Sequence, residues 1–337
     1  MVDPDKNSGI PAILISSVVA LALSLHLAQA YVGRLELSDR AGEYGRANFD
    51  TGSTNYPREV NDAEGYALKL ARPVHRAGSQ YWSIDEYLYS IVPPREVVSV
   101  SQSAYDRTYS NVYRWAEEFH PAISSDPEVV LRVDPDLFLV SSSGRADFTE
   151  ILKRAGLPVF RTYTSFTKLE EVRRTILLLG YLTGRDAEAA GVAREFDQAI
   201  TRAQRWKSAG APAPRILGYS GKYSYGGETL FNDVVRAAGG INVAAEHGVQ
   251  GYEAVNAEGI LRWNPDWIVS GAARGNSAAV LSRLLEDPAI SLTTAAKKGQ
   301  VLVFENNIFL PMSPFTALFL DALGEALYSP KTEVARD

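Results

Sequence analysis

A nine-residue pattern that occurs twice, 130 residues apart, constrains the fold of this chain more than any other feature. Glu128 to Asp136 and Glu258 to Asp266 both read Glu-x-x-Leu-Arg-x-Asp/Asn-Pro-Asp, and a short apolar run and a serine follow each copy. The apolar runs predict strands, and the Pro-Asp pair before each run ends a short helix. The pattern therefore predicts two lobes that share one local plan, a short helix followed by a strand that enters a sheet.

Short apolar runs alternate with helical stretches along most of the chain. Such alternation predicts α/β units with largely parallel sheets that are covered on both faces. We expect two similar Rossmann-like α/β lobes, over residues 56–163 and 210–330. The predicted strands are residues 96–101, 137–140 and 159–160 in the first lobe and residues 215–219, 267–269 and 301–304 in the second, and residues 56–60 and 66–70 predict a hairpin.

A long amphipathic stretch lies between the two copies of the pattern. Over residues 186–206, apolar residues recur at spacings of three and four, which is the period of a helix. As an α-helix this stretch would be roughly 31 Å long. Residues 169–181 predict a second helical run before it. We therefore expect a helical region over residues 164–209, in which one long helix forms a rigid strut between the lobes.

The N-terminal segment predicts export from the cytoplasm. Residues 10–27 are mostly apolar and lead to Ala28-Gln29-Ala30, a small-x-small pattern that signal peptidase accepts. We expect a signal peptide over residues 1–30, cleaved after Ala30, and then a flexible polar tether over residues 31–55. Two acidic residues at the start are unusual in a signal peptide, so an uncleaved membrane anchor is the alternative, since about 18 apolar residues can just span a bilayer.

Composition and missing motifs exclude several classes of function. A length of 337 residues favours two domains. The net charge of −6 and the scattered Lys and Arg disfavour nucleic-acid binding. The chain has no Cys, and its four His show no paired metal spacing, so we expect no direct capture of a bare metal ion. Neither HExxH nor GxSxG occurs, so we expect no enzyme and no catalytic residues.

The loops that follow the predicted strands are the candidate ligand-binding segments, because ligands bind outside the carboxyl ends of the strands in open α/β sheets. Arg145 and Arg274 follow the two repeated strands and suit an anionic ligand; solvated surface arginines are the alternative. Tyrosines in the loop 219–227 suit a large planar ligand, with loop packing as the alternative. The full candidate set is Gln102, Tyr105, Ser142, Arg145, Tyr163, Tyr219, Tyr223, Tyr225, Arg274 and Asn307.

Several separated segments stand in the order and spacing that are typical of a known family. They are Tyr56 to Gly65, Pro94 to Ser101, the two Pro-Asp strand entries, Ala155 to Val159, Leu179 to Gly184 and Ala237 to Ala244. Together they resemble the periplasmic binding proteins that serve iron-siderophore and cobalamin ABC importers. The resemblance covers residues 56–328 and implies two α/β lobes linked by one long helix, with a ligand cleft between the lobes and little closure.

The resemblance also implies a function and a partner. It implies a monomeric periplasmic protein that captures a metal chelate, a ferric siderophore or a cobalamin-type corrinoid, and delivers it to an ABC importer permease dimer with its cytoplasmic ATPase. No intrinsic cofactor is expected. By position in the family pattern, Glu128 and Glu258 would dock onto arginines of the permease, whereas each could also be only a first-turn acid favoured by the helix dipole. A haem-binding protein or a sensor of the same fold is the alternative, and a secreted hydrolase is a more distant one.

Overall fold

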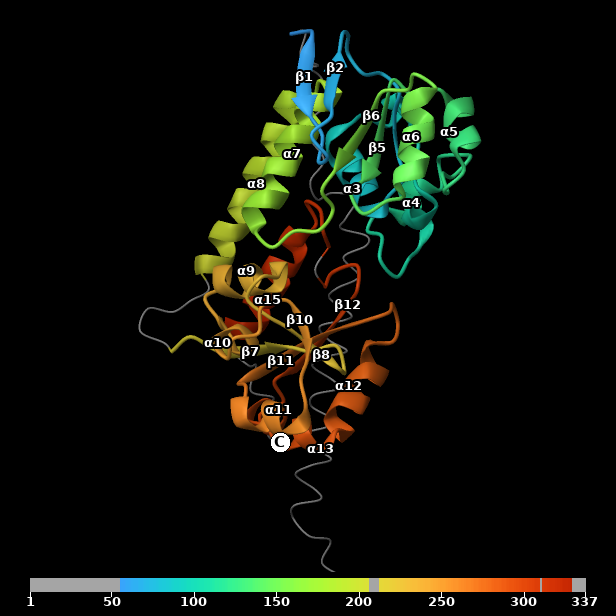
Figure 1. The fold of residues 1–337 in the computed structure, drawn as a ribbon. Helices are drawn as coiled ribbons and strands as arrows, with labels where there is room; N and C mark the ends of the chain where they lie inside the picture. Colours follow the sequence, from blue (N-terminus) through green and yellow to red (C-terminus); the bar gives the residue numbers. More distant parts are fainter. Residues whose placement is uncertain (1–54, 206–211, 310, 329–337) are drawn as a thin grey trace, which may run out of the picture.

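The computed structural model describes residues 55–205, 212–309 and 311–328, which form two α/β lobes one above the other (Figure 1). The predicted signal peptide, residues 1–30, and nearly all of the predicted tether lie outside the described residues. Within the described part of the chain, no helix is long and apolar enough to cross a membrane.

The upper lobe in Figure 1, here called the N-lobe, contains a parallel sheet in the order β4-β3-β5-β6. Its strands are β3 (Ala77–Ser79), β4 (Val97–Ser99), β5 (Leu137–Ser141) and β6 (Val159–Thr162), and its helices are α3 (Trp82–Ile91), α4 (Tyr113–Ala116), α5 (Pro127–Val133) and α6 (Ala146–Arg154). The predicted hairpin is present as β1 (Arg58–Asn61) and β2 (Ala67–Leu70).

The lower lobe, here called the C-lobe, contains a second parallel sheet in the order β12-β11-β7-β9. Its strands are β7 (Arg215–Gly218), β9 (Ile241–Asn242), β11 (Trp267–Ala272) and β12 (Val301–Glu305). Beside the sheet, β8 (Tyr223–Tyr225) and β10 (Tyr252–Ala254) form an antiparallel ribbon. The helices are α9 (Leu230–Ala237), α10 (Val243–Glu246), α11 (Ala257–Trp263), α12 (Ser277–Glu286), α13 (Pro288–Ser291), α14 (Thr294–Lys297) and α15 (Thr316–Tyr328).

The two sheets have the same topology. If the strands of each sheet are numbered in chain order, both sheets run 2-1-3-4, so β3 corresponds to β7 and β5 to β11. The sequence pattern therefore marks a duplication of the whole sheet. The prediction of two similar lobes is confirmed.

The two copies of the sequence pattern also fold alike. Helices α5 and α11 each end at a non-glycine residue in the left-handed region, Asp134 with φ 48° and Asn264 with φ 39°. An arginine from the first strand region closes each helix end. Arg76 Nε donates to the Asp134 carbonyl at 2.8 Å, and Arg215 Nη1 donates to the Trp263 carbonyl at 2.8 Å. The Asp/Asn-Pro-Asp segment is therefore a helix stop in both lobes.

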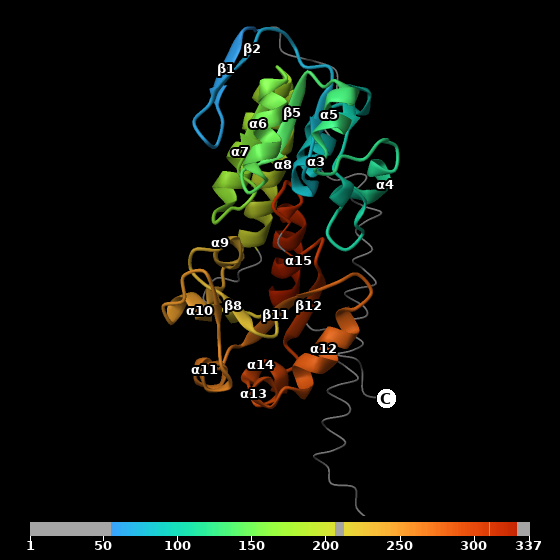
Figure 2. The ribbon, with the colours of Figure 1, turned by 45° about the vertical axis from the view of Figure 1, so that its right-hand side comes forward.

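The predicted strut is present as one helix of a pair. Helix α8 (Asp186–Arg205) packs along α7 (Leu169–Thr183), and the two run side by side along the N-lobe as far as α9 of the C-lobe (Figures 1 and 2). Gly180 permits this approach, because a Cβ there would collide with Ala189 of α8. Trp206, the last residue of the predicted strut, lies outside the described residues.

The link between the lobes has a second part that the sequence did not indicate. The largest hydrophobic cluster runs through both lobes and includes Tyr89 and Ile84 of α3, Phe196 of α8 and Phe319 of α15. Helix α15 lies against α8 and α9, and the chain just before α15 reaches into the N-lobe. A smaller cluster fills the far side of each of the two sheets. The lobes therefore share one continuous core.

Candidate functional site

A cavity of about 500 Å³ lies at the carboxyl ends of β7 and β11 in the C-lobe. These are the first and third strands of a sheet in the order 2-1-3-4, so the cavity lies at the switch point, where crevices of open α/β sheets bind ligands. Helix α12 covers its other side. The lining residues are Tyr219, Ser220, Gly221, Ser270, Gly271, Ala272, Ala273, Asn276, Val280, Arg283, Leu284, Asp287 and Asn306.

The tyrosines predicted for ligand contact differ in their surroundings. Tyr219 lines the cavity, is mostly buried and donates its hydroxyl to the Gly221 carbonyl at 2.9 Å. Burial, with a contribution from Asp287, raises the pKa of Tyr219 above its ordinary value. Tyr223 is 42% exposed. Tyr225 packs on Phe231, and burial raises its pKa to about 12, so it stays a neutral phenol.

The other C-lobe candidates lie at the contact with the N-lobe. Arg274 follows Ala273 of the cavity lining, and its guanidinium lies over the ring of Tyr113 in the N-lobe, 5.3 Å from the centroid. Asn307 is buried, and its amide donates to Oδ1 of Asn111 at 3.1 Å. The structure therefore places Asn307 in the joint between the lobes; it directly follows Asn306 of the cavity lining but does not line the cavity itself.

The N-lobe candidates follow the strand ends, as expected, but do not line the cavity. Gln102 is exposed, and Tyr105 donates its hydroxyl to the Phe119 carbonyl. Tyr163 is 60% exposed, and its hydroxyl donates to the Ala63 carbonyl at 3.3 Å, at the hairpin.

The remaining N-lobe candidates, Ser142 and Arg145, belong to the loop after β5. Arg145 is exposed and pairs with Asp147; the hydrogen bond from Arg145 lowers the pKa of that carboxyl.

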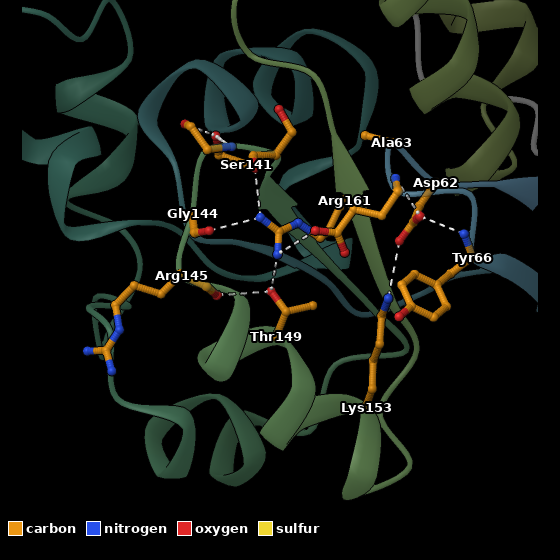
Figure 3. Close-up of polar contacts among 12 residues, drawn as sticks. Asp62, Ala63, Tyr66, Ser141, Gly144, Arg145, Thr149, Lys153 and Arg161 are labelled. Atoms are coloured by element: carbon orange, nitrogen blue, oxygen red, sulfur yellow. Dashed lines mark hydrogen bonds and ion pairs between the residues drawn. The ribbon is translucent and has the colours of Figure 1, made fainter.

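A buried arginine that sequence analysis missed fixes the loop after β5. Arg161 of β6 donates from Nη2 to the carbonyls of Ser142 at 2.7 Å and Gly144 at 2.8 Å (Figure 3). Its Nη1 forms an ion pair with Glu64 of the hairpin at 3.2 Å. Beside it, Lys153 pairs with the buried Asp62 at 3.2 Å. Arg161 thus joins the loop after β5, through hydrogen bonds to its carbonyls, to the hairpin, through an ion pair.

A buried carboxyl, Glu86 of α3, organises the joint between the lobes. Its Oε1 accepts from the backbone and side-chain nitrogens of Asn111 at 2.8 and 2.9 Å, and its Oε2 accepts from the Ser313 hydroxyl. Asn111 Nδ2 also donates to the Asn307 carbonyl at 2.8 Å. Burial raises the pKa of Glu86 to about 8, while these hydrogen bonds lower it in part. Polar groups from both lobes thus converge on one carboxyl.

The two glutamates predicted for docking occupy matching positions. Glu128 and Glu258 are exposed residues in the first turns of α5 and α11. Among residues 55–205, 212–309 and 311–328, neither carboxylate takes part in an ion pair or a side-chain hydrogen bond. Three residues later, Leu131 and Leu261 are 38% and 40% exposed. Each lobe therefore presents the same pair, a carboxylate and an apolar side chain.

Across the part of the chain that the structure describes, no group of three or more His, Cys, Asp or Glu could hold a metal ion.

These features define a class of protein: two duplicated α/β lobes on a helical support, with a ligand-sized cavity at a sheet switch point. The family model for periplasmic binding proteins matches residues 79–307, more than half of the chain, and the chain belongs to that family of solute-binding proteins.

Individual relatives agree with this assignment. The cobalamin-binding protein of Halobacterium salinarum is 27% identical over 258 residues, which cover 75% of this chain and 69% of the relative. The Fe(3+) dicitrate-binding periplasmic protein FecB of Escherichia coli is 24% identical over 188 residues, covering 55% of this chain and 61% of FecB. The structure of the periplasmic heme-binding protein RhuT from Roseiflexus sp. RS-1 superposes with a TM-score of 0.63 at 21% identity, covering 75% of this chain and 98% of RhuT, and shows the shared fold.

Proposed function

We propose that this protein captures a metal chelate outside the cytoplasm and delivers it to the permease of an ABC importer. The observation that carries the proposal is the cavity at the C-lobe switch point, whose volume of about 500 Å³ lies in the range of small-molecule sites. The family assignment and the names of the relatives, which bind cobalamin and ferric dicitrate, support the choice of a chelate.

In this proposal the cargo rests on the C-lobe cavity, between the loops after β7 and β11, and the N-lobe covers it. Tyr219 and Arg274 are the contacts from the cavity side, with Tyr223 and Tyr225 beside them. From the N-lobe, the loops after β4 and β5 supply Gln102, Tyr105, Ser142 and Arg145, and Tyr163 lies beyond. The buried amide of Asn307 belongs to the joint and is left out of the contact set.

The delivery step assigns a partner. Glu128 and Glu258, one on each lobe, would engage the two equivalent subunits of a permease dimer, because two matching surfaces on one monomer fit a two-fold symmetric partner. Charges of this kind contribute chiefly to orientation and association rate. Export by a signal peptide over residues 1–30 would bring the protein to the periplasm.

The test is ligand-induced thermal stabilisation. A ligand that binds only the folded state raises the melting temperature as its concentration exceeds the Kd. We expect at least one member of a panel of ferric siderophores, ferric citrate, corrinoids and haem to raise the melting temperature without being chemically altered. A panel with no stabilising member would reject capture of a chelate, and turnover of a member would favour an enzyme instead.

A further inference from the structure

A buried arginine stands in the N-lobe sheet at a position where the C-lobe sheet has a buried valine. Strand pairing places Arg161 of β6 opposite Val140, and Val303 of β12 opposite Ser270. Val140 and Ser270 are 130 residues apart, the offset of the repeated sequence pattern, so Arg161 and Val303 are counterparts. Arg161 is 2% exposed and Val303 is 6% exposed. Because burying a guanidinium is costly and the duplicated sheet forms without one, Arg161 serves a purpose outside the sheet.

The guanidinium of Arg161 holds the loop that leaves the sheet after β5. Its Nη2 donates to the carbonyl oxygens of Ser142 at 2.7 Å and Gly144 at 2.8 Å. At the same offset, Ser142 is the counterpart of Ala272, which lines the C-lobe cavity. The loop that Arg161 holds is therefore the N-lobe counterpart of a loop that lines the proposed binding cavity.

The turn of the β1–β2 hairpin holds Arg161 from the other side. Glu64 in this turn forms an ion pair with Nη1 of Arg161 at 3.2 Å, and the backbone nitrogen of Ala63 donates to the Arg161 carbonyl at 2.9 Å. The buried carboxylate of Asp62 fixes the turn, because it accepts from the backbone nitrogens of Glu64 and Tyr66, each at 2.9 Å (Figure 3). The guanidinium thus has an anchored acidic partner on one side and the loop carbonyls on the other.

We propose that Arg161 is a positioning residue for ligand binding, which together with Glu64 keeps the loop after β5 in the conformation that receives the cargo. The proposal rests on the chelate-capture function and names the residues that set the geometry of its N-lobe contact. Arg161 is buried, so it acts through the loop and does not touch the ligand. A loop that is ordered before the ligand arrives lowers the entropic cost of binding. The rigid fork of a guanidinium suits this role, since it can donate to several acceptors at once.

The test combines hydrogen–deuterium exchange of the ligand-free full chain with calorimetric titration of ferric citrate, cyanocobalamin and haemin. Arg161→Lys keeps the charge but loses the fork that reaches both carbonyls and Glu64. Glu64→Gln removes only the ion pair. Glu59→Gln is the matched control, because Glu59 is an exposed carboxylate on the same hairpin and pairs with Lys69 at 2.7 Å. Melting temperatures establish that each variant is folded.

We expect amide exchange in residues 142–145 to become about ten-fold faster in Arg161→Lys, since the loop loses hydrogen bonds to a charged group, and to rise less in Glu64→Gln. Exchange within β5 should not change. The probe that binds the wild type should bind Arg161→Lys about ten-fold more weakly, and at saturation it should restore the protection of the loop. Glu59→Gln should match the wild type in both measurements.

Several outcomes would overturn the positioning role. Unchanged loop exchange in Arg161→Lys would reject it, and so would faster exchange throughout the N-lobe with unchanged affinity, which would make Arg161 merely structural. Equal effects in Glu59→Gln would assign them to the charge of the hairpin. If Arg161→Lys does not fold, Glu64→Gln decides, and it must show both faster loop exchange and weaker binding. Failure of every chelate in the thermal panel would instead reject the proposed function itself, and the role of Arg161 in binding with it.

Discussion

Two adjacent carboxyls in α3 are the least expected side chains of the N-lobe, since both are fully buried. Asp85 accepts hydrogen bonds from the Ser101 backbone and hydroxyl and from the Ser79 hydroxyl, and Glu86 lies at the joint between the lobes. Burial is the largest influence on both and raises the pKa of Asp85 to about 7 and that of Glu86 to about 8. Both pKa values lie well above the ordinary range for carboxyl groups.

The pKa of Glu86 predicts a pH-dependent stability. Between pH 4.5 and pH 8, Glu86 stays protonated in the folded protein and is ionised in the unfolded chain. The free energy of unfolding should therefore be highest below pH 4.5, as far as this group is concerned, and should fall as pH rises through about 8, by up to about 1.4 kcal/mol per pH unit. Denaturant titrations of the wild type and of Glu86→Gln across this range measure the slope.

Glu86→Gln should flatten that slope, because glutamine keeps a donor and an acceptor for Ser313 and Asn111 but does not titrate. Glu150→Gln on the exposed face of α6 is the control and should leave the slope unchanged. A slope that is the same in Glu86→Gln and in the wild type would mean that Glu86 is ionised in the folded protein.

The sequence identified the loops at the carboxyl ends of the strands more reliably than it identified the individual side chains that line the cavity. Tyr219 was predicted for the site and lines the cavity, because a residue just after a strand in an α/β sheet has to lie at the carboxyl edge. Arg161 was missed, because its partners, the loop after β5 and Glu64 of the hairpin, lie in other segments of the chain. Asn307 follows a strand as well, but its neighbour across the joint, Asn111, is 196 residues away. A contact between residues so far apart in the chain cannot be predicted from a local sequence pattern.

Helices α5 and α11 are the elements for which a docking role can be tested. Glu128→Ala combined with Glu258→Ala should lower the rate of association with the importer on the order of ten-fold at low salt, because the two exposed charges orient the encounter. Affinity for the chelate should not change, since neither residue lines the cavity. Surface plasmon resonance against the permease in nanodiscs measures the rate, and calorimetry measures chelate binding.

A matched pair controls for loss of negative charge. Glu150→Ala combined with Glu286→Ala also removes one exposed carboxylate from each lobe, on α6 and α12, and should leave the association rate near that of the wild type. If both double variants slowed association equally, the effect would come from the loss of net negative charge and not from docking by Glu128 and Glu258. A loss of chelate affinity in Glu128→Ala with Glu258→Ala would contradict the separation of the two roles.

The sequence predicted the strands whose residues form an apolar or β-branched run. The strands β5, β7, β11 and β12 contain runs of apolar or β-branched residues and were predicted close to their positions. Strand β3 was missed because it reads Ala-Gly-Ser, and Gly78 is required there since a Cβ would collide with Ser99 of the neighbouring strand. Helix α3 was missed because it is buried almost all round and therefore lacks a polar face.

The whole molecule is more rigid than two lobes on a single strut would be. The central hydrophobic cluster passes without interruption from α3 through α8 to α15, and Glu86, Asn111 and Asn307 add hydrogen bonds between the lobes. Rotation of one lobe against the other would expose apolar surface and leave buried polar groups without partners, which is costly. The prediction of little closure was made for the helical strut alone, and the continuous core gives it a stronger physical basis.

Small-angle X-ray scattering of the full chain tests this rigidity directly. The radius of gyration should change by less than about 1 Å when ferric citrate, or whichever chelate stabilises the protein, reaches saturation, as in complexes whose partners are preorganised. Asn111→Ala combined with Asn307→Ala removes the amide pair at the joint, so the ligand-free form should become more variable in shape and the change on binding should grow. Asn232→Ala, which removes a mostly buried amide inside the C-lobe, is the control and should not alter the change. A compaction of several ångströms in the wild type would show that the joint opens without ligand, and the shared core would then have to separate more easily than its contacts indicate.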